Sequence, residues 1–89
     1  MLRISRVTAA GPQVALKVEG DLMGVWVPLL EAECLSHLEA RKQVEVDFAG
    51  VGFIDRNGVA MVHDLFARGV QVVRATALVS TLLGRSSTP

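Results

Sequence analysis

The sequence predicts a small α/β domain of the α+β kind, with a mixed four-stranded sheet and three helices packed on it in the order ββαβαβα. Three observations predict this fold. The chain has 89 residues, the length of one small domain. Hydrophobic residues make up 51% of it, enough for a core. Segments of alternating apolar residues are interleaved with segments of helical periodicity. We expect one domain over residues 1–84 and a flexible polar tail over residues 85–89.

The first half of the chain predicts a β-hairpin followed by a helix. A short strand over residues 2–7 and an alternating strand over residues 13–19 flank the turn signal Ala10-Gly11-Pro12. Residues 20–24 are expected to form a loop. From about residue 25 to residue 40 the spacing becomes helical. The apolar stripe of this helix is Trp26, Val27, Leu29, Leu30, Cys34, Leu35 and Leu38.

The second half predicts two further strand–helix units. Residues 44–48 alternate as a third strand, and residues 49–54 form a glycine-containing apolar connection. A second helix opens at Asp55 and stops at a glycine near residue 69. Residues 70–73 form a fourth short strand, and a third helix runs from about residue 76 to residue 84.

Charge and composition exclude several classes of function. Nine basic and nine acidic residues cancel, and only three Phe and one Trp are available for base stacking, so we expect no nucleic-acid partner. No apolar run approaches the length of a membrane span, and the first residues do not resemble a signal peptide. The single cysteine fits a reducing compartment. We therefore expect a cytoplasmic protein that does not insert into a membrane.

No catalytic or metal-binding constellation emerges from the residues. His37 lies three positions after Cys34, a spacing that suits a nucleophile with its base or half a zinc site. Packing of Cys34 within the apolar stripe is the stronger interpretation. His63 lies on another helix, and Asp47 and Asp55 lie on different elements, the second as a helix cap. The sequence therefore predicts a binding module with no cofactor, no metal and no enzymatic activity.

One charge conflicts with its local environment. Arg56 lies at the start of the second helix, where the helix dipole favours negative charge. Its neighbours Asp55 and Asn57 are both good N-caps, so the helix start itself is well supported. Two interpretations are open. Arg56 is a solvated side chain paired with Asp55 or Asp21, or it contacts an acidic partner or an anion beside the helix N-terminus.

The stretch around this arginine resembles a family signature. Residues 44–60 read V-E-V-D-F-A-G-V-G-F-I-D-R-N-G-V-A, which is similar to the V-V-L-D-L-S-G-V-x-F-I-D-S-S-G-L-A motif of STAS domains, the family of anti-sigma factor antagonists. Val14 to Met23 resembles the V-x-L-x-G-E-L-D segment of that family, and residues 76–83 resemble its S-P-x-V-x-x-L-L helix. The resemblance covers about residues 13–84 and implies the STAS fold.

The departures from the motif concern its switch. In the switching members a kinase phosphorylates the first serine of D-S-S-G, and the added charge releases the bound partner. Arg56 occupies that position here and Asn57 the next, so neither can be phosphorylated by a Ser/Thr kinase. Asp55 and Gly58 are retained. Met23 stands where the family has a loop aspartate, with an acidic residue two places earlier.

The resemblance implies a protein-interaction module that resembles an anti-sigma factor antagonist in bacterial transcription or signalling, with an anti-sigma factor or kinase-like regulator as partner. The alternatives are an accessory subunit of an ABC-type lipid transporter, bound to its ATPase subunit, and a domain that senses an anion or nucleotide. Trp26 is either a core residue or an exposed hot spot. The oligomeric state is not predicted. The expected partner-binding residues are Asp21, Met23, Trp26, Asp55, Arg56, Asn57, Gly58, Met61 and Val62.

Overall fold

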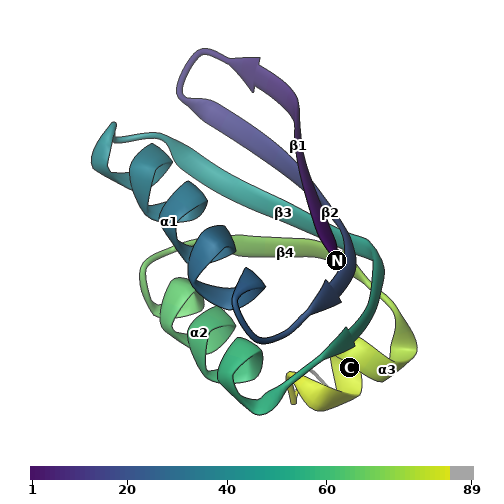
Figure 1. Ribbon diagram of the computed structural model, residues 1–89. Coiled ribbons are helices and arrows are strands. Elements are labelled where there is room, and N and C mark those ends of the chain that lie inside the picture. The colour runs from purple at the N-terminus through teal and green to yellow at the C-terminus, as the bar shows by residue number, and fades with distance from the viewer. Residues whose placement is uncertain (85–89) are drawn as a thin grey trace.

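Within residues 1–84, four strands and three helices follow one another in the predicted order ββαβαβα (Figure 1). The structure, a computed structural model, describes residues 1–84, apart from the side chains of residues 8–10. The predicted tail over residues 85–89 lies outside the described residues. The elements are β1 (Leu2–Ala10), β2 (Gln13–Leu22), α1 (Trp26–Glu39), β3 (Gln43–Ile54), α2 (Arg56–Ala67), β4 (Gln71–Ala75) and α3 (Ala77–Leu82).

The strands form one mixed sheet in the order β1-β2-β3-β4, which confirms the predicted fold class. The hairpin β1–β2 is antiparallel, whereas β2–β3 and β3–β4 are parallel. Parallel neighbours need a crossover connection, and α1 and α2 provide the two crossovers. Figure 1 shows α1 and α2 side by side over the sheet, and α3 packs against β3 and β4. The loops that lead into α1 and α2 therefore leave from the carboxyl ends of two adjacent parallel strands.

The core lies between the sheet and its helices. Alternate residues of β2 and β3 are buried, and the residues between them are exposed or half-buried, as the predicted alternation requires. Helix α2 contributes a buried stripe at helical spacing, and α3 contributes Val79, followed by its buried C-cap residue Leu83. The most deeply buried large side chains are Phe48, Leu16, Leu22, Leu30, Ile54, Leu65 and Leu83.

Two segments expected to be connections are strand instead. Residues 20–22 extend β2, and residues 49–54 extend β3, because the two segments pair with each other in parallel. Register shifts interrupt this part of the ladder, after Lys17 and after Gly20. Such irregularities break the two-residue period, so the alternation that marks a strand in the sequence disappears here although the strand continues.

The apolar stripe predicted for α1 is confirmed in its centre and wrong at one position. Val27, Leu30 and Cys34 are buried, and Trp26 is half-buried and packs against the core. Leu29, in contrast, is 52% exposed. It follows Pro28 on the outer side of the helix, about 100° in helical phase from its buried neighbour Leu30.

Candidate functional site

The start of α2 is organised by Asp55, as the sequence predicts. Asp55 has an extended backbone, with φ −85° and ψ 178°, and is the N-cap of the helix. Its Oδ1 accepts a hydrogen bond of 2.7 Å from the backbone N–H of Gly58. This bond satisfies one of the free N–H groups in the first turn.

The second carboxylate oxygen of Asp55 reaches a different segment. Oδ2 accepts a hydrogen bond of 3.1 Å from the backbone N–H of Gly24, in the loop between β2 and α1. The backbone N–H of Asp55 also donates to the carbonyl oxygen of Leu22, at 3.1 Å. The end of β2, the β2–α1 loop and the start of α2 are therefore joined around one side chain. Both oxygens of Asp55 are engaged within the chain, which gives this side chain a structural role, and its contact with a partner stays a prediction.

Gly58 allows these segments to approach closely. An added Cβ would lie 2.8 Å from Cγ1 of Ile54 and 2.9 Å from the carbonyl oxygen of Leu22. Gly58 is itself buried. Its contribution is therefore to the packing of α2 against the end of β2, and its predicted contact with a partner is wrong.

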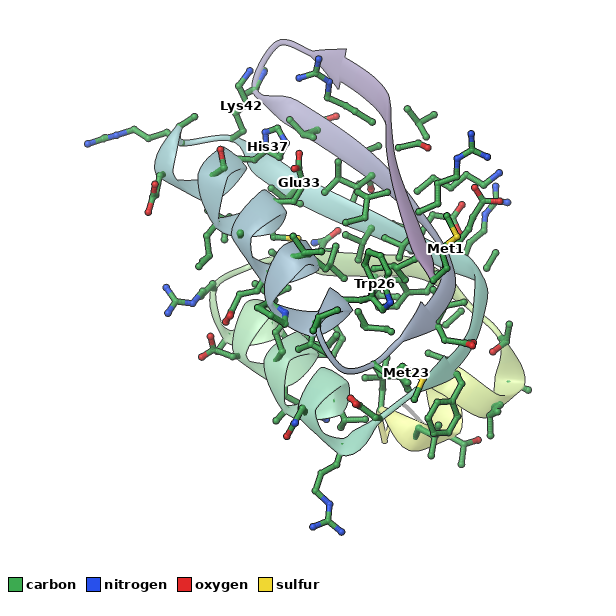
Figure 2. All side chains as sticks on the ribbon, viewed as in Figure 1. Met1, Met23, Trp26, Glu33, His37 and Lys42 are labelled. Carbon is green, nitrogen blue, oxygen red and sulfur yellow. The ribbon has the colours of Figure 1, made fainter. Side chains whose placement is uncertain are left out.

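The exposed residues beside this junction form one candidate surface. They come from the end of β2 and the β2–α1 loop on one side and from the first residues of α2 on the other. Figure 2 shows Met23 at this end of the molecule, and Trp26 farther inside, between the start of α1 and the sheet. We call these exposed residues the loop–helix surface. It consists of Asp21, Met23, Val25, Arg56 and Asn57.

Two of the predicted contact residues are not on the surface. Met61 is only 6% exposed and Val62 only 1%. With Gly58 and Leu65 they recur at intervals of three and four, which places them on the inner face of α2. The prediction that they contact a partner is wrong, because both are part of the core. Trp26 is half-buried against the same core, as its core-packing interpretation predicts.

Arg56 is exposed, and its charge has no ion-pair partner in the part of the chain that the structure describes. Among residues 1–84, no carboxylate lies within 4.0 Å of its guanidinium. The predicted pairing with Asp55 or Asp21 is therefore wrong. Arg56 adds a positive charge to a helix end whose dipole is already positive. The loop–helix surface thus combines exposed apolar side chains with one unpaired cation.

Cys34 and His37, whose spacing suits a nucleophile with its base or half a zinc site, both lie on α1. Within residues 1–84 no three His, Cys, Asp or Glu side chains gather closely enough to hold a metal ion. His37 pairs through Nε2 with Glu33 at 3.1 Å. Burial, together with the nearby charge of Glu33, raises the pKa of the Cys34 thiol to about 12, so this thiol is neutral and a poor nucleophile. None of the helices in this part of the chain has the length and apolarity to cross a bilayer.

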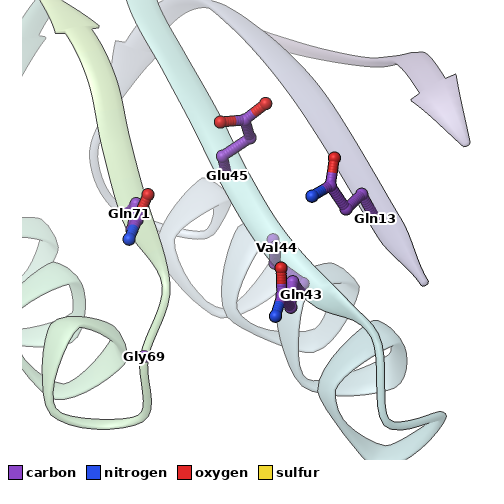
Figure 3. Close-up of a pocket in the computed structure, with 6 residues that line it drawn as sticks. All are labelled: Gln13, Gln43, Val44, Glu45, Gly69 and Gln71. Atoms are coloured by element: carbon purple, nitrogen blue, oxygen red, sulfur yellow. The ribbon is translucent and has the colours of Figure 1, made fainter. Parts of the chain in front are cut away.

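A hollow of about 210 Å³ lies at the opposite end of the sheet (Figure 3). It is formed at the first residues of the three parallel strands, far along the sheet from the carboxyl ends that carry Asp55. None of the predicted site residues lines it, and ligands of open α/β sheets bind at the carboxyl ends. Its lining residues are Gln13, Gln43, Val44, Glu45, Gly69 and Gln71.

Comparisons with known proteins define the fold. No protein-family model matches the sequence, and no curated protein matches it either. The structure is similar to that of the anti-sigma factor antagonist SpoIIAA in its unphosphorylated form, with a TM-score of 0.65 and 12% identity over 93% of this chain and 96% of that one. It is also similar to two structures of Mglu, with TM-scores of 0.60 and 0.54 and 20% identity. The matches cover 83% and 81% of this chain but only 19% and 22% of Mglu.

Proposed function

We propose that this chain, which has the STAS-like fold of SpoIIAA, is a non-enzymatic module that binds another protein through its loop–helix surface. The partner is a regulator of the anti-sigma factor or kinase-like class in bacterial transcription or signalling, and the module acts in the cytoplasm. The observation that carries the proposal is the unpaired Arg56, exposed beside the junction at Asp55.

The composition of the surface supports binding to a protein. Met23 and Val25 are exposed apolar side chains on a short loop, and Arg56 is an exposed cation a few residues beyond the neighbouring strand. Methionine and arginine, both present on this surface, are among the residue types enriched at protein interfaces. A partner that offers an apolar side chain next to an acidic group would match both features.

Phosphorylation at the start of α2 does not control this binding. Residues 50–62 contain no serine, threonine or tyrosine. A phosphoserine would bring about two negative charges to this helix end, whereas Arg56 brings a fixed positive charge. The interaction proposed here is therefore set by the presence of the partner and not by a kinase acting at this position.

Charge reversal at Arg56 tests the proposal. The Arg56→Glu variant and the unaltered protein are each used as bait in a bacterial lysate, and the captured proteins are identified by mass spectrometry. A glutamate at this position suits the helix dipole, so folding is retained while the surface charge is reversed. We expect the protein captured by the unaltered bait to be lost from Arg56→Glu.

Arg68→Glu is the matched control, because it makes the same charge change at the other end of α2. It breaks only the exposed pair with Asp64, which contributes little to stability. Arg68→Glu should therefore capture the partner normally. Equal capture by Arg56→Glu would place the interface elsewhere. Capture of the ATPase subunit of a transporter would assign the same surface to the transporter role.

A further inference from the structure

We infer that Asp55 is a positioning residue that holds the N-terminal ends of α1 and α2 together through one carboxylate. Its Oδ1 caps α2 through Gly58, and its Oδ2 accepts from Gly24, the residue before the N-cap of α1. These two bonds span three and thirty-one residues of sequence. The link is a property of this chain and needs no partner to be measured.

Helix α1 depends on this link because it has no side-chain cap of its own. Its N-cap is Val25, which has no hydrogen-bonding side chain, and its first turn contains no acidic residue. Backbone bonds from Trp26 to Met23 and from Val27 to Gly24 close the turn that leads into the helix. The Asp55 carboxylate therefore fixes Gly24, whose carbonyl closes this turn, and places a negative charge beside the start of α1.

Only a carboxylate can make both bonds. Ionised aspartate has two acceptor oxygens, and here they serve donors on two different segments. Asparagine has one acceptor oxygen, and its NH₂ group would face an N–H donor. Asparagine is an equally good N-cap, so Asp55→Asn keeps the cap of α2 and loses the link to Gly24.

The link matters for the loop–helix surface, a step that rests on the proposed function. Met23 and Val25 lie on the Gly24 side of the link, and Arg56 and Asn57 lie on the α2 side. A partner that contacts both sides binds more tightly when their relative position is already fixed, because less ordering accompanies binding. Asp55 thus presents the two halves of the surface as one unit.

Residue-specific amide hydrogen exchange, followed by NMR on the full chain, tests the link. We expect exchange at the Gly24 amide to rise about tenfold in Asp55→Asn, the change expected for loss of a hydrogen bond to a charged group. Gly58 should remain protected. Asp55→Ser, which also caps but is shorter, should give the same result at Gly24.

Thr76→Ala is the control for a general loss of stability. The Thr76 hydroxyl caps α3 by accepting from the N–H of Val79 at 3.2 Å. Its removal weakens a helix start elsewhere and should leave Gly24 exchange unchanged. Unchanged exchange at Gly24 in both Asp55 variants would overturn the inference. Faster exchange with undiminished partner capture would support the link and overturn the step that ties it to partner binding, whereas Arg56→Glu tests the location of the surface separately.

Discussion

Replacing Gly58 with alanine should destabilise the domain, although alanine is the better helix former. In the interior of a helix the exchange from glycine to alanine stabilises by about 1 kcal/mol. The added Cβ would, however, lie 2.8 Å from Cγ1 of Ile54 and 2.9 Å from the carbonyl oxygen of Leu22. The balance between these two effects decides the sign.

The close contacts should prevail because one of them is to backbone. The Ile54 side chain can rotate, but the Leu22 carbonyl accepts the 3.1 Å hydrogen bond from Asp55. Overpacking of this kind costs about 1–3 kcal/mol, and displacement of the carbonyl adds about 1 kcal/mol for the weakened hydrogen bond. After subtraction of the helix-propensity gain, we expect a net loss of about 2 kcal/mol. For a domain of this size that loss lowers Tm by about 8–16 °C.

Thermal unfolding followed by circular dichroism measures this loss, with Gly52→Ala as the matched control. A Cβ on Gly52 would meet only Oδ1 of Asp21, at an ordinary 3.5 Å, so this variant should be as stable as the unaltered protein or slightly more so. Gly58→Ala with an unchanged or higher Tm would refute the argument that α2 approaches the end of β2 too closely for a side chain.

Two further predictions concern the core. The pKa of the Cys34 thiol is raised from 9.0 to about 12 in the folded chain. Above pH 9 the unfolded chain therefore loses a proton that the folded chain keeps. Between pH 9 and pH 12 the free energy of unfolding should fall by about 1.4 kcal/mol per pH unit. Urea titrations from pH 8 to 11 should show a shallower fall for Cys34→Ala, and equal slopes would contradict the assignment. Phe48→Ala should lower the free energy of unfolding by about 3–5 kcal/mol. Phe53→Ala, at a position 42% exposed, should lower it by less than about 1 kcal/mol in the same urea titrations. Similar losses for the two variants would contradict the burial pattern.

The element order could be predicted because it depends on local patterns. Alternating residues in β2 and β3 and the helical periods of α1 and α2 are visible within a few residues of sequence. The last three residues of β2 and the later half of β3 were not visible, because their pairing includes register shifts. The exposure of the Phe53 side chain could not be predicted for the same reason. It sits in an apolar run, and only the register, which pairs it with the exposed Asp21, explains its exposure.

The site divides in the same way into local and non-local parts. The cap from Asp55 to Gly58 spans three residues and was predicted, whereas the bond to Gly24 spans thirty-one residues and depends on the parallel pairing of β2 with β3. The error at Met61 and Val62 was avoidable. Met61 and Val62 follow Gly58 by three and four residues, so the helical period places them on the same face of α2 as Gly58. That face packs against the end of β2.

Arg56 is the residue at the start of α2 whose charge has no structural role among the described residues. Asp55 and Gly58 are each accounted for by a contact inside the chain, the first by two hydrogen bonds and the second by close approach. Arg56 has no such contact among the described residues, and its charge opposes the helix dipole by about 0.3–1 kcal/mol. A side chain that brings a small local cost and no internal contact does not contribute to the fold through its charge. Charge reversal at this position should therefore change the charge of the loop–helix surface without loss of stability, and so it separates binding from stability.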